Sequence, residues 1–333
     1  MTEQIKEMQR EQIDNPIILD KQKIIDAINT DKQYTDNGVL IRKWEGSDEY
    51  DSFTSHITKD DVSFIGILNG KFEREGYGIN IFSNGDKYLG YFEEDKRNKH
   101  GIYLFNPIIT GENTIEQECY YGFWKSNKKS HHGIYFWMKE NINNTEFDNA
   151  NFNVYIGEIK NDQYKRGTFL TKDDDNYYLY HGNFDGDGTK NDDKAFFYSA
   201  KNDRLICGKI VDNVFVNGHV AFFDEEGEVR DLVYVEFEDK DKVKLIKRSN
   251  EMDEDEKNNS LEDLTRFRNV ILDTDYFGDL YNKYKEIKSF VNDGMNNIDV
   301  LDDKEKFPAI IKLCVDYNEN NIYEDIEKIA LVR

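Results

Sequence analysis

The middle of the chain repeats one short pattern: an aromatic or apolar residue, any residue, a glycine, any residue, and a second large apolar residue. Its clearest copy is Tyr88-Leu89-Gly90-Tyr91-Phe92. Glycines at positions 66, 90, 122, 157, 182 and 208 mark six copies, which are 24, 32, 35, 25 and 26 residues apart. This spacing indicates a unit of about two dozen residues with two insertions, and predicts a stack of similar structural units.

Each copy predicts a β-strand. Side chains alternate between the faces of a strand, so the first, third and fifth positions share one face, with a large group on either side of a bare glycine. Glycine inside a strand indicates close approach of another group, and we expect the next hairpin's aromatic side chain to fill that space. A second glycine-led strand follows about ten to twelve residues later. Its glycines are Gly78, Gly101, Gly133, Gly167 and Gly218.

Polar stretches such as 93–100 and 125–132 separate the paired strands and suit hairpin loops. Each unit is therefore expected to be a two-stranded ribbon, and because a lone hairpin is marginal in water, the ribbons depend on their neighbours. The expected framework residues are Phe64, Gly66, Gly78, Tyr88, Gly90, Phe92, Gly101, Tyr103, Tyr121, Gly122, Trp124, Gly133, Tyr135, Tyr155, Gly157, Gly167, Tyr180, Gly182, Phe184, Gly208 and Gly218.

The pattern resembles the membrane occupation and recognition nexus (MORN) repeat, in which an aromatic-x-Gly-x-aromatic strand, a loop and a Gly-led strand follow one another. The best copies are 88–105 and 120–137, and the first copy contains Gly76-Tyr77-Gly78. The resemblance covers residues 64–223 and weakens at Ala195, Cys207 and Val214. It implies a mainly β fold, an antiparallel β-hairpin solenoid. The alternative is an antiparallel sheet of another family.

Composition limits the possible partners. The formal net charge is -23 and the pI is about 4.7, which argues against nucleic acid, because phosphate binding depends on Lys and Arg. The same charge opposes docking on anionic lipid, and no run approaches the length of a membrane-spanning helix. Cys119, Cys207 and Cys314 are far apart and have no metal-ligand spacing. We therefore expect free thiols in a cytoplasmic protein.

The repeats are flanked by segments of different character. Residues 1–37 are expected to be helical, residues 38–250 to form the hairpin domain with two closing strands at its end, and residues 251–259 to be an acidic linker. Residues 260–333 are expected to form a helical segment in which Ser260 caps the first helix. This amphipathic segment either packs on its own sheet or binds a partner. The candidate contact residues within it are Phe277, Tyr284 and Ile287.

No catalytic motif or cofactor site is found in the sequence. Asp185-Gly186-Asp187-Gly188-Thr189 resembles the opening of a calcium loop, but Lys190 takes the sixth position, where glycine is required, and Phe196 the twelfth, where Glu is required. His100, His131 and His132 adjoin second-strand glycines, so their repeat position explains them. The chain is therefore expected to be non-enzymatic, with no cofactor and no metal.

The sequence thus predicts a structural and interaction protein whose partners are other protein subunits of a large assembly. The resemblance implies a cytoskeletal scaffold, most specifically one of the ciliary axoneme, similar to radial-spoke heads. The alternative is a phosphoinositide- or membrane-associated adaptor, or the regulatory subunit of an enzyme complex. Candidate aromatic contacts are Tyr91, Tyr121, Phe123, Tyr177 and Tyr178, each of which can equally be ordinary packing on the sheet.

Overall fold

The computed structural model describes residues 53–59, 62–69, 73–111, 113–143, 146–174, 176–186, 188–224, 228–239, 242–272 and 276–296. The helices expected in 1–37 and beyond residue 296, and the start of the hairpin domain at 38–52, lie outside these residues. Within them the chain is mainly β, with an open antiparallel sheet followed by two α-helices.

The chain divides into two compact units. Among the described residues, the first unit comprises those within 53–107, 117–130 and 286–296, and the second comprises those within 108–116 and 131–285. The boundary falls inside two strands and one helix, so each unit is described by itself.

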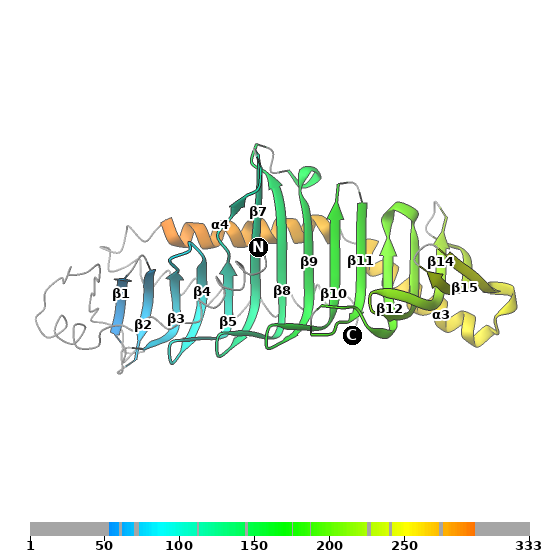
Figure 1. Cartoon of the computed structure of the whole chain (residues 1–333), viewed down its shortest axis with the longest axis horizontal. Helices are drawn as coiled ribbons and strands as arrows, with labels where there is room; N and C mark the ends of the chain where they lie inside the picture. Colours follow the sequence, from blue (N-terminus) through cyan, green and yellow to red (C-terminus); the bar gives the residue numbers. More distant parts are fainter. Residues whose placement is uncertain are drawn as a thin grey trace, which may run out of the picture. The chain divides into compact units, whose positions relative to one another are not determined.

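The sheet of the first unit is built in chain order, each strand antiparallel to the next (Figure 1). Its repeat glycines are direct cross-strand partners: Gly66 faces Gly78, Gly78 faces Gly90, Gly90 faces Gly101, and Gly101 faces Gly122. The strands are β1 (Phe53–Lys59), β2 (Val62–Leu68), β3 (Arg74–Ile81), β4 (Lys87–Glu93), β5 (Lys96–Leu104) and most of β7 (Thr114–Lys125). The sequence repeat is thus a continuous glycine row across the sheet.

In the second unit, repeat glycines are again cross-strand partners. Gly157 faces Gly167, which faces Gly182, and farther along Ala195 faces Gly208, which faces Gly218. The short strand β6 (Ile108–Ile109) pairs with the first residues of β7. The other strands, neighbours in chain order, are β8 (Lys128–Asn141), β9 (Asn151–Lys160), β10 (Gln163–Asp173), β11 (Asn176–Asn183), β12 (Asp192–Ser199), β13 (Arg204–Val211), β14 (Val214–Phe223), β15 (Val229–Asp239) and β16 (Lys242–Arg248). Short 3-10 turns η1 (Phe147–Asn149), η2 (Ala200–Asn202) and η3 (Ser249–Glu251) interrupt the connections.

The polar stretches predicted as hairpin loops are shorter turns than expected. Strand β5 begins at Lys96 and β8 at Lys128, so only two residues separate each from the strand before. Both turn residues have positive φ in four hairpins, which is the geometry of the type I′ turn that matches strand twist. The turn pairs are Glu94 and Asp95, Ser126 and Asn127, Asn161 and Asp162, and Asp212 and Asn213. The rest of each predicted loop is strand, and the β4–β5 pair has a register shift there, between Gly90 and Phe92.

Two helices follow the sheet, α3 (Glu254–Leu272) and α4 (Tyr276–Asn296). The predicted linker 251–259 is wrong, because α3 already begins at Glu254. Asp253 Oδ1 accepts the backbone N–H of Glu256 at 2.8 Å, so Asp253 rather than Ser260 caps the helix. Acidic residues in the first turn also favour a helix start there, since they complement the helix dipole.

The two faces of the sheet differ, because side chains alternate along each strand. We call the face that carries the glycine row and the tyrosines two residues before it the aromatic face. The opposite face is the helix face. In the second unit, α3 and the first part of α4 pack on the helix face, through residues described below.

Candidate interaction surfaces

The space beside Gly66, Gly90, Gly157 and Gly182 is filled by the aromatic ring two residues earlier in the same strand. A Cβ added to Gly90 would lie 2.5 Å from the hydroxyl oxygen of Tyr88, and one added to Gly101 would lie 2.4 Å from the same oxygen. The Tyr88 ring therefore lies along its own strand, over the glycine two residues later and over the glycine opposite. The expectation that the next hairpin supplies the ring is wrong.

The tyrosine hydroxyls explain this geometry. Each repeat tyrosine donates a hydrogen bond to the carbonyl oxygen three residues later, past the bare glycine. The distances are 3.1 Å for Tyr88 to Tyr91, 2.9 Å for Tyr120 to Phe123, 2.7 Å for Tyr155 to Glu158 and 2.9 Å for Tyr180 to Asn183. Tyr120, not the predicted Tyr121, takes the framework position, and Tyr121 is fully buried. The repeat thus satisfies a polar hydroxyl inside an apolar layer.

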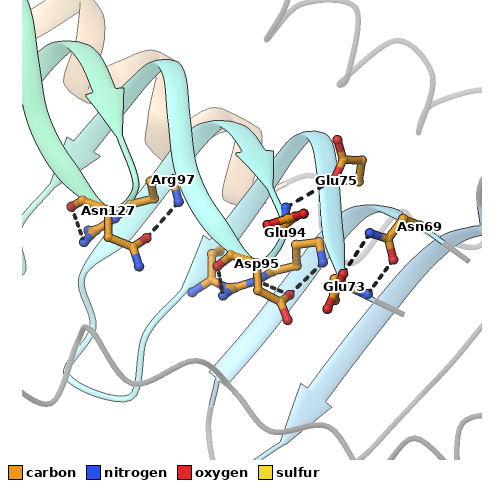
Figure 2. A network of polar contacts seen from close by, with 9 residues as sticks. Asn69, Glu73, Glu75, Glu94, Asp95, Arg97 and Asn127 are labelled. Atoms are coloured by element: carbon orange, nitrogen blue, oxygen red, sulfur yellow. Dashed lines mark hydrogen bonds and ion pairs between the residues drawn. The ribbon is translucent and has the colours of Figure 1, made fainter. Parts of the chain in front are cut away.

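Neighbouring hairpins are linked at their turns by a reciprocal pair of hydrogen bonds, which we call the turn ladder (Figure 2). The backbone N–H of Arg74 donates to Oδ1 of Asp95 at 2.7 Å, and the N–H of Asp95 donates to the carbonyl of Arg74 at 3.1 Å. Arg97 and Asn127 make the same pair at 2.8 and 3.0 Å, and Lys190 and Asn213 at 2.9 and 3.1 Å. The second residue of one turn therefore caps the strand of the hairpin before it.

The basic side chains of the turn ladder lie over the aromatic layer. The Arg74 Cζ is 4.8 Å from the ring centre of Phe92, and the Arg97 Cζ is 4.4 Å from that of Trp124. Lys190 Nζ is 5.4 Å from Tyr180. Arg74 and Arg97 also donate to the carbonyls of Asp95 and Asn127. Each arginine thus combines cation–π attraction with a side-chain hydrogen bond, so these charges link neighbouring hairpins.

The helix face of the second unit is closed by the chain's own helices. In α4, the ring centre of Phe277 lies 4.8 Å from that of Tyr177, and the ring centre of Tyr284 lies 5.8 Å from that of Phe136. The Tyr281 hydroxyl donates a hydrogen bond of 2.9 Å to the buried carboxylate of Glu140. In α3, the Phe267 ring stacks on Phe196 at 4.8 Å. The predicted contact residues Tyr177, Phe277 and Tyr284 thus make intramolecular contacts.

In the first unit, Ile287 is fully buried, and Lys87 Nζ donates to Asn292 Oδ1 at 2.7 Å. The α4 residues of this unit therefore also contact their own sheet. Of the two possibilities for the tail, packing on its own chain is the arrangement that the described helices show.

A cross-strand row that includes two histidines and a cysteine lies beneath α3. His181, Phe196, Cys207, His219 and Tyr234 are successive cross-strand partners on β11 to β15. Burial lowers the pKa of His181 to about 4, and its Nδ1 lies 2.9 Å from the Thr168 hydroxyl. Burial raises the pKa of the Cys207 thiol to about 12, so it is an unreactive thiol at neutral pH. These five cross-strand residues, which we call the seam, lie between the sheet and α3 and are not a reactive site.

The end of the seam meets the start of α3. His219 Nε2 is 3.4 Å from Oε1 of Glu256, and Lys247 Nζ is 3.0 Å from Oε2 of the same carboxylate. The hydrogen bond from Lys247 lowers the pKa of Glu256, and burial lowers the pKa of His219. Glu256 therefore ties α3 to β14 and β16 as an anion.

The aromatic face of the second unit keeps many large rings half-buried. Their ring centres lie close together: those of Trp137 and Phe169 are 6.0 Å apart, and those of Phe197 and Phe215 are 6.2 Å apart. Phe215 in turn lies 5.8 Å from Phe237. The aromatic row, as we call this set, consists of Trp137, Phe169, Tyr178, Phe197, Phe215, Phe222 and Phe237. Tyr178 is the only one of the predicted contact residues that belongs to it.

Tyr91 and Phe123, the remaining predicted contacts, are half-buried in the first unit. The Tyr91 ring lies 5.2 Å from Tyr77 and 3.7 Å from Lys99 Nζ, and Phe123 packs on His100 at 4.3 Å. The aromatic row itself was missed, because its members occupy different positions of the repeat. The turn ladder was missed too, although its members Asp95, Asn127 and Asn213 each follow a repeat glycine by five residues.

No helix among the described residues is long and apolar enough to cross a membrane. In the same part of the chain, no three His, Cys, Asp or Glu side chains are grouped as metal ligands would be. No model of a protein family matches the chain, and no curated protein matches its sequence.

Proposed function

We propose that this chain is a non-enzymatic interaction scaffold that binds another protein through the aromatic row. The observation that carries the proposal is the asymmetry of the sheet in the second unit. Its helix face is packed by α3 and α4, whereas the aromatic face retains half-buried rings on β8, β10, β11, β12, β14 and β15.

Rigid aromatic side chains suit a protein interface. They supply large contact area at low conformational cost and are enriched at binding hot spots. The rings of the row are fixed by the strands below, because Phe197, Phe215, Phe222 and Phe237 pack on a buried cluster of Ile206, Val220, Val233 and Val235. A partner would meet a surface that is already ordered, which lowers the cost of association.

The specific form of the proposal is a subunit of a cytoskeletal assembly, and most specifically of the ciliary axoneme. It is supported by the resemblance of the repeat to MORN proteins, and fold-level analogy of this kind sets an expectation for a role rather than a site. The net charge of -23 favours a protein partner with a neutral or basic surface over a polyanion.

The test is a comparison of two double variants expressed in the native cell. Phe197→Ser with Phe237→Ser removes two rings from the row, and Tyr91→Ser with Tyr234→Ser removes two half-buried rings outside it. Quantitative mass spectrometry of purified assemblies is expected to show partner subunits lost only with the row variant, while circular dichroism and thermal melts show both variants folded. Equal recovery of partners by both variants would contradict the proposal.

A further inference from the structure

In the part of the chain that the structure describes, no strand covers the outer edge of β16. Among the described strands, β16 stands last in the sheet order and pairs only with β15. All seven of its residues are exposed or half-exposed, with Val243 56% and Leu245 45% exposed. An edge of this kind presents unpaired backbone N–H and C=O groups that can accept a further strand.

The charge of β16 is opposite to that of the chain. Its sequence, KVKLIKR, contains Lys242, Lys244, Lys247 and Arg248 and no acidic residue, although the protein as a whole carries a net charge of -23. Lys247 pairs with Glu256, Arg248 lies 4.0 Å from Asp231, and Lys244, which is 58% exposed, lies 3.7 Å from Glu236. The charged side chains of β16 itself are therefore all basic, and the exposed Lys244 can also face a strand on the outer edge.

The inner edge of β16 already shows which kind of strand it accepts. Across the β15 pairing, Lys244 faces Glu236, Val243 faces Phe237, and Leu245 faces Val235. Acidic residues thus meet lysines on one face, and apolar residues meet Val243 and Leu245 on the other. Cross-strand pairs of these two kinds are the ones that stabilise a sheet.

A second copy of β16 fits this edge poorly. Antiparallel self-pairing centred on Leu245 would place Lys242 opposite Arg248 and Val243 opposite Lys247, and parallel self-pairing would place every lysine opposite itself. Like charges directly opposite each other destabilise a sheet. Edge lysines commonly guard against such pairing, and the same lysines favour a strand of opposite charge.

We propose that the outer edge of β16 binds an extended, acidic segment of a partner protein in which acidic and apolar residues alternate, and that the segment adds to the sheet as a further strand. Backbone hydrogen bonds would supply affinity. Lys242 and Lys244 would select acidic positions, and Val243 and Leu245 would select apolar ones. The inference does not depend on the role of the aromatic row.

The probe is a labelled peptide with the sequence of Leu232–Asp239, LVYVEFED, titrated into the full chain and followed by fluorescence anisotropy. One control, the clustered peptide VLEEYFVD, has the same composition with its two glutamates side by side, so that they point to opposite faces of a strand. Another control has lysine in place of each acid. Saturable binding of the first peptide alone is expected. Equal binding of the clustered peptide would show general charge attraction and overturn the proposal, as would absence of binding.

Two variants test the lysines. Lys242→Gln with Lys244→Gln is expected to weaken binding roughly fivefold, the effect of losing two exposed ion pairs. Lys125→Gln with Lys160→Gln makes the same change in net charge at exposed positions of other strands and is expected to leave binding unchanged. Equal weakening by both variants would contradict a site on β16.

Hydrogen exchange measured with the peptide bound distinguishes addition of a strand from replacement of β15. Slower exchange in β16 with unchanged protection of β15 is the expected result, whereas loss of protection in β15 would show strand exchange and overturn the proposal. Because neither lysine variant alters the phenylalanines of the aromatic row, failure here is distinguishable from failure of the proposed function.

Discussion

Arg97 and Asn127 are hydrogen-bonded to each other through their backbones and both side chains. The N–H of Arg97 donates to Oδ1 of Asn127 at 2.8 Å, and the N–H of Asn127 donates to the carbonyl of Arg97 at 3.0 Å. Asn127 also has a φ of 70°, a left-handed conformation that Asn tolerates better than most residues. One residue therefore closes its own turn and caps the preceding hairpin.

Substitutions at Asn127 separate these two roles. Asn127→Gly keeps the left-handed backbone but removes the Oδ1 acceptor, so we expect a loss of about 1 kcal/mol in unfolding free energy. Asn127→Ala adds the conformational cost of a positive φ and is expected to lose about 2 kcal/mol. Asn127→Asp, which keeps the acceptor, serves as the control. Urea unfolding measures all three, and equal losses for Gly and Asp would contradict the capping role.

Tyr155→Phe tests the hydroxyl that passes over the glycine. Its hydroxyl lies 2.7 Å from the carbonyl oxygen of Glu158 and 3.2 Å from that of Arg166, and burial raises its pKa. Removing the hydroxyl leaves both carbonyls without this donor, which we expect to cost about 1–2 kcal/mol. Tyr178→Phe, on the half-buried surface of the same sheet, is the matched control and is expected to change stability by less than about 0.5 kcal/mol. Similar losses of unfolding free energy for the two variants would contradict the stabilising hydrogen bonds assigned to the Tyr155 hydroxyl.

Gly157→Ala tests the glycine row. An added Cβ would lie 2.5 Å from the carbonyl oxygen of Arg166 and 2.5 Å from the Cα of Gly167, so two backbones must separate. We expect a loss of about 3 kcal/mol or more, as for other overpacked cores. Gly186→Ala meets only the flexible side chain of Gln163 and is expected to cost under about 1 kcal/mol. Thermal melts that rank the two variants in the opposite order would refute the close approach of the strands.

The buried His181 predicts a pH dependence of stability. Its pKa in the folded protein is about 4, below the unfolded value near 6.5, so the unfolded chain binds the proton first. This contribution to stability is complete above about pH 6.5 and is lost as the pH falls toward 4. Between pH 7 and pH 5 the loss is about 2 kcal/mol.

The measurement compares wild type with His181→Gln. Urea unfolding at about pH 7 and about pH 5 is expected to show a smaller decrease for the variant, because glutamine does not titrate. His219, whose pKa burial also lowers, keeps part of the decrease in both proteins. An identical decrease in the two proteins would show that His181 is not held neutral by burial.

The sequence predicted the strands well because their signal is local. Period-two alternation around Gly90 or Gly157 specifies both the strand and the face of each side chain. The closing strands were expected over 228–238 and 242–247, within one residue of the observed β15 and β16. The helical periodicity from residue 261 to 291 was also correct, although these residues belong to two helices, α3 and α4, rather than one. The helix start was misplaced because Ser260 and Asp253 are both good caps, and sequence alone did not rank them.

The candidate surfaces were harder to predict because they depend on contacts between distant strands. The aromatic row joins Trp137 to Phe237 across strands far apart in the chain, and no single repeat copy contains it. Whether Phe277 and Tyr284 face a partner or the sheet depends on tertiary packing, which amphipathic periodicity does not specify. The ring over Gly90 was assigned to the wrong strand because alternation gives the face of a side chain but not the direction in which it leans.

The most direct test of the account is site-specific photo-crosslinking in the native cell. A benzophenone side chain placed at Phe197, in the aromatic row, and at Tyr91, outside it, replaces one ring with another of similar character at each position. The account predicts a discrete adduct with a partner protein from position 197 and none from position 91. Adducts from position 91 alone, or from neither position, would contradict the claim that the aromatic face is the binding surface of this scaffold.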